Sequence, residues 1–304
     1  MNPESLNHSH QELKRHISSR YDGESYIQTN MKPLSFFVHT EPTDMLSILY
    51  EPSLCVIVQG SKAVGVDNDL FSYDPDTYLL ASVHTPARIC ITEASSERPY
   101  MGLTITFSME QIFDVLKEID QTEKRLVRTE RRLYFGTMED KLLNPILRLV
   151  RLLDTPEDIA VLSPLIIKEI LYLIMRTEGG DFIRQYVMDG SSTQQVVKAI
   201  AHIKENFSEM LNISELAKSI GMSESSLYSS FKKITALSPL QFQKTLRLQE
   251  ARRRLMIWDR EVSQIAFEVG YESPSQFSRE YSRMYGISPK ADAKRMRIVT
   301  HNKG

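Results

Sequence analysis

Near the end of the chain, one pattern of hydrophobic and polar positions occurs twice. Residues 213–239 and 262–289 each begin with a short run whose apolar residues recur on one helical face. Each run ends at a glycine, Gly221 or Gly270, and glycine readily adopts the left-handed conformation that closes many helices. Serines near the start of the runs are the expected N-caps, namely Ser214 and Ser263. Each copy therefore predicts a helix followed by a tight turn.

A second helix follows each turn, with Ser223 as the expected N-cap in the first copy, and its apolar residues are spaced three or four apart. These residues are Leu227, Phe231 and Ile234 in the first copy and Phe277, Tyr281 and Met284 in the second. The other positions are mostly small, polar or basic, so they are expected to face solvent. Two helices joined by a short turn, the second exposing such side chains, fit the major groove of DNA. One isolated copy is equally well explained as an ordinary helical hairpin, but the duplication favours binding to two successive segments of the groove.

The segment between the two copies predicts a rigid helical connection. Ser238 is the expected N-cap, Pro239 suits the first helical position, and 240–256 contains neither glycine nor proline. Such a helix spans roughly 25 Å at 1.5 Å per residue, which is shorter than one turn of DNA at roughly 34 Å. Four arginines on it are suited to phosphate contacts, although a solvated charged face explains them equally well: Arg247, Arg252, Arg253 and Arg254.

The chain between Pro33 and Phe107 has a different pattern, with short runs rich in Val, Ile, Thr, Tyr and Phe divided by turn residues. Seven strands are expected: 34–40, 53–60, 62–66, 70–73, 77–81, 87–92 and 100–107. Strands this short and this closely spaced predict a sandwich or a small barrel.

Helical spacing returns after Ser108. Helices are expected at 109–119, 142–153, 158–176 and 194–207, with a charged helix end and loop at 118–132. The helix at 158–176 is apolar nearly all round, and such a helix is buried on more than one side. Its second covering surface is either its own chain or another subunit. We therefore expect a homodimer contact within residues 142–176.

The net charge of −2 hides two oppositely charged parts. Residues 1–190 hold 19 Lys and Arg against 28 Asp and Glu, whereas residues 191–304 hold 18 against 11, which gives −9 and +7. The basic part contains the repeat, as expected of a nucleic-acid-binding domain. The sequence has no apolar run of membrane-spanning length and no signal-peptide pattern at its start, so we expect a cytoplasmic protein without a membrane partner. Cys55 and Cys90 are interpreted as small buried residues of a reducing compartment, and a redox switch between them stays open.

Several motifs in the basic part carry a family resemblance. Residues 194–297 resemble the DNA-binding domain of AraC/XylS-type transcription regulators at Leu-Arg-Leu-Gln-Glu-Ala-Arg (246–252), Val-Gly-Tyr-Glu-Ser (269–273) and Gly-Ile-Ser-Pro (286–289). Residues 52–62 are similar to the N-terminal domain of one branch of that family. The resemblance implies an α+β chain with a cupin-like β-barrel and a helical extension, followed by an all-α domain of two helix-turn-helix units joined by a linker helix. The family usually has glycine after Thr235, whereas this chain has Ala236.

The resemblance assigns roles to residues of the two recognition helices. Base contacts are expected from Ser225, Tyr228, Ser229, Ser275, Gln276 and Arg279. Phosphate contacts are expected from Ser223, Lys232, Lys233 and Arg283. Arg279 suits a guanine edge and Gln276 an adenine edge, each worth roughly 1–3 kcal/mol of discrimination. The first helix has serines where long donors would be needed, so it should discriminate less.

A barrel suits one small effector at its mouth. Alternation along a strand does not say which face points inward, so the expected pocket residues are a hypothesis: Phe37, His39, Cys55, Ile57, Tyr78, Leu80 and His84. A cupin-type metalloenzyme would need clustered ligands. The barrel offers only His39 and His84, far apart in sequence and not in a His-x-His pair, so no metal, cofactor or catalytic residue is expected.

These observations predict five segments. They are an N-terminal segment at 1–30 that is flexible or helical, an effector-binding and dimerisation domain at 31–188, a linker at 189–193, a DNA-binding domain at 194–297 with units at 213–235 and 262–285, and a tail at 298–304. The expected function is transcription regulation, with activation as the expected direction. The expected partners are promoter DNA, a small effector and RNA polymerase. The alternative is a cupin-type metalloenzyme or ligand-binding protein with an accessory DNA-binding domain.

Overall fold

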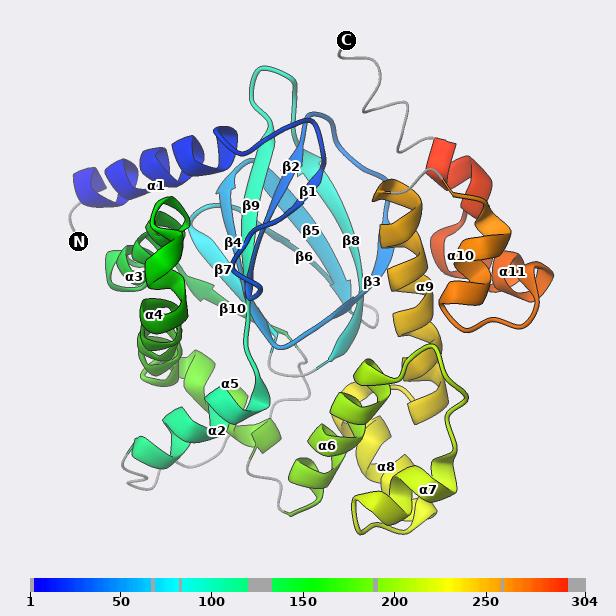
Figure 1. The fold of residues 1–304 in the computed structure, drawn as a ribbon. Coiled ribbons are helices and arrows are strands. Elements are labelled where there is room, and N and C mark those ends of the chain that lie inside the picture. Colours follow the sequence, from blue (N-terminus) through cyan, green and yellow to red (C-terminus); the bar gives the residue numbers. More distant parts are fainter. Residues whose placement is uncertain are drawn as a thin grey trace. The chain divides into compact units, whose positions relative to one another are not determined.

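The computed structural model describes residues 3–66, 69–81, 84–119, 133–187, 191–257 and 260–294. The chain forms two compact units. One holds residues 1–45 and 50–188, and the other holds 189–304 together with the short segment 46–49. The first is β-rich with helices and the second is helical, which confirms the expected α+β class (Figure 1).

Two antiparallel sheets form the N-terminal unit. The six-stranded sheet has the order β1 (Tyr26–Gln28), β2 (Leu34–His39), β9 (Tyr100–Thr106), β4 (Ser53–Gln59), β7 (Thr77–Ala81) and β10 (Leu133–Thr137). The four-stranded sheet has the order β3 (Leu46–Tyr50), β8 (Thr85–Glu93), β5 (Ser61–Val66) and β6 (Asp69–Tyr73). All seven expected strands are present within two residues of their predicted bounds. Strands β1, β3 and β10 were not predicted.

Helices cover one face of the six-stranded sheet (Figure 1). They are α1 (Pro3–Ser18), α2 (Met109–Glu118), α3 (Asp140–Arg151), α4 (Ile159–Met175) and α5 (Glu178–Val187), with two short 3₁₀ turns at Leu152–Asp154 and Pro156–Asp158. Helix α1 is anchored by the fully buried Leu13 and Ile17, and by the two-pronged contact of Glu12 with Arg151 at 2.7 Å. The N-terminal segment is therefore helical. Helix α5 was not predicted, and its first turn contains Gly179 and Gly180, which are unfavourable inside a helix.

The C-terminal unit contains α6 (Ser191–Glu205), α7 (Ile213–Ser219), α8 (Glu224–Thr235), α9 (Pro239–Ile257), α10 (Val262–Glu268) and α11 (Pro274–Tyr285). Helix α6 starts within the segment that we expected to be a linker. The remainder of the charged stretch at 120–132 and the tail at 298–304 lie outside the described residues.

The two helix-turn-helix units share a backbone framework. Gly221 and Gly270 both have the expected positive φ, 71° and 93°. At Gly270 a side chain would also run into the backbone of Ser208, so this turn needs glycine for space as well as for conformation. The predicted caps of the first helices are wrong. Asn212, whose side chain accepts from the backbone N–H of Ser214, caps α7, and Glu261 precedes α10 without a side-chain cap.

Candidate nucleic-acid interface

Buried aromatic and aliphatic residues fix the orientation of both recognition helices. On α8, Leu227 and Phe231 are fully buried, and Phe231 meets the α9 residue Phe242 edge to face at 5.4 Å between ring centroids. On α11, Phe277 and Tyr281 are fully buried. Because one face of each helix is fixed in this way, the opposite face is presented to solvent.

The residues predicted to contact DNA lie on these solvent-facing surfaces. The exposed residues among them are Ser223, Ser225, Ser229, Lys232 and Lys233 of the first copy and Ser275, Gln276, Arg279 and Arg283 of the second. Tyr228 is half-buried. Arg279 and Arg283 form no ion pair with any residue that the structure describes, so their guanidinium groups are available to a ligand. That these residues contact DNA stays a prediction.

Ser223 has a structural role as well. Its hydroxyl accepts a hydrogen bond from the backbone N–H of Ser226 at 3.2 Å and so caps α8, as the sequence predicted. The same hydroxyl lies 3.2 Å from that of Ser225. The equivalent residue of the second copy, Ser273, caps α11 through the backbone N–H of Gln276.

The four arginines of α9 have partners within the chain. Arg247 donates to the backbone carbonyl oxygens of Phe207, Glu209 and Gly270, each at 2.7 Å. It thereby ties the segment before α7 to the turn of the second unit, and its partial burial lowers its pKa. Because these contacts join the first helix-turn-helix unit to the second, Arg247 helps to fix the distance between the two recognition helices.

The other three arginines of α9 pair with carboxylates. Arg252 donates to Asp292 at 2.9 Å and lies over the ring of Tyr285, at 4.7 Å from its centroid. Arg253 and Arg254 both donate to Glu250 at 2.7 Å. Arg252 and Arg254 are thus mostly buried in ion pairs, at 17% and 18% exposed, whereas Arg253 stays on the solvated surface at 43%. Phosphate contact by these arginines stays a prediction.

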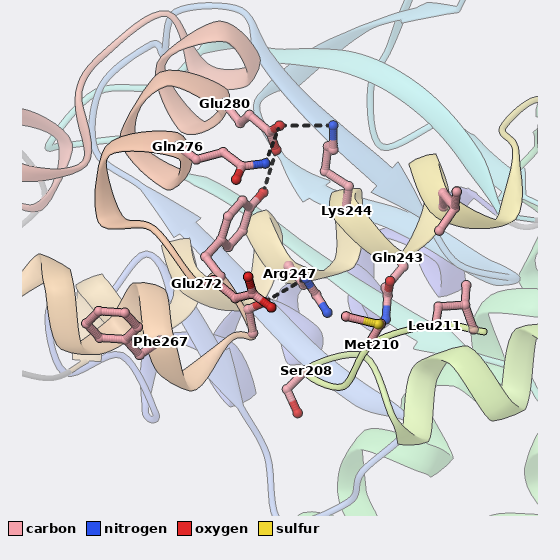
Figure 2. Close-up of a pocket in the computed structure, with 13 residues that line it drawn as sticks. Ser208, Met210, Leu211, Gln243, Lys244, Arg247, Phe267, Glu272, Gln276 and Glu280 are labelled. Atoms are coloured by element: carbon pink, nitrogen blue, oxygen red, sulfur yellow. Dashed lines mark hydrogen bonds and ion pairs between the residues drawn. The ribbon is translucent and has the colours of Figure 1, made fainter.

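A cleft of about 550 Å³ lies in the C-terminal unit beside α9 and α11 (Figure 2). Its lining combines the exposed apolar residues Met210, Leu240 and Phe267 with polar residues of α9 and α11. Sequence reasoning did not find this cleft, because its walls come from segments far apart in the chain.

Glu280 collects hydrogen bonds at the edge of this cleft. It accepts from the Tyr271 hydroxyl at 2.8 Å, from Lys244 at 3.1 Å and from the Gln276 amide at 3.4 Å (Figure 2). Burial acts to raise its pKa, but these donors outweigh burial and the pKa of Glu280 is lowered. Glu280 therefore stays ionised and holds one predicted base-contacting side chain, Gln276, against the α9 side of α11.

Contacts between the two sheets of the N-terminal unit show which strand faces point inward. Tyr73 of one sheet packs on Phe135 of the other at 5.5 Å between ring centroids, so these two rings lie between the sheets. Phe135 is in register with Leu79, which places Leu79 on the inner face and its neighbours on the outer one. On β4, Leu54, Val56 and Val58 belong to the core shared with the helices, so Cys55 and Ile57 face inward.

The expected pocket residues therefore divide into two groups. Cys55 and Ile57 point between the sheets, as do Phe37 and His39 from the face of β2 opposite the helix-facing Phe36 and Val38. Tyr78 and Leu80 were placed wrongly. They belong to the core beneath the helices, and the Tyr78 ring lies across Gly136 there.

His84, the last of the expected pocket residues, is buried just before β8.

Within the described residues, no group of three or more His, Cys, Asp or Glu is arranged to hold a metal ion. Likewise, none of the helices described there is both long and apolar enough to cross a membrane. Both cysteines are free thiols, Cys55 buried and Cys90 partly exposed.

The geometry defines a protein with one unit of two antiparallel sheets covered by helices and one unit with tandem helix-turn-helix motifs. Its residues 30–182 match the family described as "AraC-type transcriptional regulator N-terminus", and residues 216–295 match "Helix-turn-helix domain". The chain belongs to the AraC/XylS family of transcription regulators.

Curated relatives are similar over part of their length. The chain is 34% identical over 114 residues to the raffinose operon transcriptional regulatory protein RafR of Pediococcus pentosaceus, which covers 36% of this chain and 41% of the relative. It is 29% identical over 141 residues to the transcriptional activator RhaS of Pectobacterium atrosepticum, which covers 45% and 47%. The matches thus span less than half of these relatives.

Solved structures extend the likeness of fold to nearly the whole chain. ToxT of Vibrio cholerae superposes with a TM-score of 0.66 at 11% identity, covering 88% of this chain and 98% of ToxT. A two-unit layout with an N-terminal β-rich part and a C-terminal helical part is therefore shared at the level of fold.

Proposed function

We propose that the protein regulates transcription by binding promoter DNA through both helix-turn-helix units, under the control of a small molecule bound inside its barrel. The observation that carries the proposal is the pair of matched units, each exposing polar and basic residues on its second helix. The charge of the chain supports it, because the +7 balance lies in the same segment as these units. Activation is the expected direction, and RhaS, a relative of this chain, is named an activator.

The two recognition helices are expected to enter successive major-groove segments. Helix α9 has 19 residues and so spans roughly 28 Å, and Arg247 braces the two units against each other. Arg279 is suited to a guanine edge with two hydrogen bonds, while Lys232 and Arg283 are suited to phosphates. RNA polymerase is the partner through which such a regulator acts, and the cytoplasm is the compartment that holds both.

Selection of genomic DNA fragments by the purified protein at two salt concentrations tests this function. We expect one motif with two half-elements about one DNA turn apart, and an affinity that falls steeply with salt because phosphate contacts release counterions. Arg279→Ala should cost roughly 1–3 kcal/mol and relax the preference at one base pair. Arg279→Lys is the matched control, because it keeps the charge but loses the planar fork. Recovery of no motif above nonspecific background would refute the proposal.

We further propose that the chain forms a homodimer through α4. One face of this helix is buried in its own unit by residues such as Ile166, Ile170 and Ile174. The other face exposes large apolar side chains, at 67% for Val161, 39% for Leu162, 61% for Leu165 and 47% for Tyr172. Lys168, which pairs with Glu118, lies among these residues, but four large exposed apolar side chains on one helix are costly in water and typical of an interaction surface.

Sedimentation equilibrium tests the dimer. Leu165→Glu should shift the population to monomer, because it places a charge among the exposed apolar side chains of α4. Leu70→Glu is the matched control, since Leu70 is exposed to a similar degree, 62%, in the same domain but lies on β6. Equal mass for both variants and the unaltered protein would exclude α4 as the interface.

We also infer that the chain is not an enzyme. The relatives that it matches are named as regulators, which supports this inference. Metal analysis of the purified protein tests the alternative, because a cupin-type metalloenzyme would contain stoichiometric iron, manganese or zinc.

A further inference from the structure

Polar side chains from both sheets converge between them in the N-terminal unit. Tyr50, Lys62 and Tyr73 come from the four-stranded sheet, and Cys55 and Tyr100 come from the six-stranded sheet. The three tyrosines are buried, with exposed fractions of 6%, 4% and 4% for Tyr50, Tyr73 and Tyr100. Lys62 pairs with Tyr73 across β5 and β6, and its ammonium lies 5.6 Å from the centroid of the Tyr50 ring, so these three side chains lie together. Cys55 and Tyr100 lie on the facing strands β4 and β9, and both influence the buried tyrosines electrostatically.

Lys62 is the positive charge of this cluster. It is half-buried, is in register with Tyr73 and lies on the same face of β5 as the fully buried Val64, so its side chain points inward. Its ammonium lies 5.6 Å from the centroid of the Tyr50 ring. No carboxylate within the described part of the chain forms an ion pair with it. Burial lowers the pKa of Lys62, as expected for a charge that has lost water and gained no counter-ion.

The tyrosines supply hydroxyl groups in the same place. Burial raises the pKa values of Tyr50, Tyr73 and Tyr100, so all three are neutral and able to donate hydrogen bonds. The Tyr50 hydroxyl is buried, and the Tyr73 hydroxyl is the neighbour that interacts with it. Because only one O–H of such a pair donates to the other, the second O–H is left to donate to a bound acceptor.

The backbone also makes room for the Tyr100 hydroxyl. This hydroxyl lies over Gly102, where a Cβ would approach it to 2.8 Å. Glycine therefore lets the Tyr100 ring lie along the inner face of β9, with its hydroxyl directed into the space between the sheets.

We propose that Lys62, together with the hydroxyls of Tyr50, Tyr73 and Tyr100, binds the carboxylate of a small organic acid between the sheets. One ammonium balances one negative charge, whereas a phosphate dianion would leave excess charge in a buried site. The surrounding inner face is apolar, with Ile57 and Leu79 fully buried, so the rest of the ligand is hydrocarbon or aromatic. This inference rests on the proposed function, because the acid would be the effector. What it adds is the chemical class of that effector.

The test measures the thermal unfolding midpoint and the Kd of the full-length protein with matched ligand pairs. Each pair is a carboxylic acid and its primary amide: benzoate with benzamide, hexanoate with hexanamide, and phenylacetate with phenylacetamide. At least one acid should raise the midpoint while its amide does not. Lys62→Met should weaken binding of that acid by about ten- to hundred-fold, which is the usual worth of a hydrogen-bonded charge. Lys32→Met is the matched control, because Lys32 is exposed in the same unit.

The thermal unfolding midpoint measured without any acid distinguishes a lysine that binds a ligand from one that supports the fold. If Lys62 is kept for a ligand, Lys62→Met should unfold at an equal or higher temperature than the unaltered protein when no acid is present, because a costly buried charge is removed. A lower midpoint would mean that Lys62 supports the fold, and the proposal would be wrong. It would also be wrong if no acid bound, if the amides bound equally well, or if Lys62→Met bound the acid unchanged.

DNA binding by the same preparations distinguishes this inference from the proposed function. If the protein selects a DNA motif but ignores every acid, only the effector class is refuted. If it binds an acid through Lys62 but selects no DNA, the regulator function fails while the site stands.

Discussion

Ala236 ends the first recognition helix in a conformation that suits glycine. Its φ is 63° and its ψ is −2°, in the left-handed region, and it is the only non-glycine residue with positive φ in the described part of the chain. Gly286 occupies the equivalent place after α11, with φ 73° and ψ −2°. Both residues donate their N–H to the carbonyl four residues earlier, at 2.9 and 2.8 Å. The two turns are therefore the same structure with different residues.

The free-energy difference follows from that geometry. A left-handed conformation costs a non-glycine residue roughly 1–2 kcal/mol. Glycine loses more entropy on folding, which offsets roughly 0.4–1 kcal/mol of the gain. Ala236→Gly should therefore stabilise the C-terminal unit by about 1 kcal/mol. The reverse change, Gly286→Ala, should destabilise it by a similar amount, since a Cβ at Gly286 would meet no atom within 4 Å and only the conformation is penalised.

Urea unfolding followed by tryptophan fluorescence measures both effects. The sequence has a single tryptophan, Trp258, which lies between the two recognition helices in the sequence, so its fluorescence is expected to follow unfolding of the unit that carries both substitutions. The midpoint should rise for Ala236→Gly and fall for Gly286→Ala, with an unchanged slope. A thermal shift of about 4–8 °C corresponds to 1 kcal/mol in a domain of this size. If Ala236→Gly proved neutral or destabilising while Gly286→Ala was tolerated, the argument from backbone strain would be refuted.

Three further predictions concern the C-terminal unit. Arg247→Ala should lower the free energy of unfolding in urea by about 3 kcal/mol, because it leaves three carbonyl oxygens without their charged donor. Arg253→Ala is the control and should lower it by at most about 1 kcal/mol, because the Arg253 side chain is 43% exposed. Glu280 has a lowered pKa in the folded protein, so its stabilising contribution is present above its unfolded pKa of 4.5 and is lost as the pH falls below that value. Glu280→Gln should therefore weaken the dependence of the free energy of unfolding on pH in this acidic range. An unchanged pH profile would contradict the assignment. Ser229→Arg should add a guanine preference to the first half-element in a selection experiment, and a motif identical to that of the unaltered protein would count against base contact at this position.

The helix-turn-helix units were predictable because their signals are local. Glycine at a left-handed turn, serine at an N-cap and apolar residues three or four apart each act within one or two helical turns of the chain. Ser223 and Gly221 have their expected roles for that reason. The cap of α7 was misplaced by two residues, since both Asn212 and Ser214 suit an N-cap and only the hydrogen bonds decide between them.

The inner face of the barrel was not predictable from alternation. All seven residues of β4 are buried, because helices cover one face of its sheet and the second sheet covers the other. A strand buried on both sides has no alternation between polar and apolar residues that would reveal its orientation. Lys62 was passed over for a related reason: a lysine in a strand resembles a solvent-facing residue until its register with Tyr73 is known.

The roles of the α9 arginines depend on partners that are distant in sequence. Arg247 binds carbonyl groups 23 and 40 residues away, and Arg252 binds Asp292, 40 residues away. A cluster of positive residues on one helix gives no sign of such partners. In a nucleic-acid-binding unit it suggests phosphate contacts, but here Arg247 binds carbonyl groups next to both helix-turn-helix units, and the other three arginines pair with carboxylates.

The two copies keep one framework and differ where they are exposed. Their recognition helices have the same length of 12 residues and end in equivalent left-handed turns. At the positions equivalent to Gln276, Arg279 and Glu280, the first copy has serine each time. Serine is too short to make two hydrogen bonds to a base edge or to reach α9 as Glu280 does. Since long donors and the residue that orients one of them occur together only in the second copy, we expect the stronger sequence preference in the half-element bound by α11.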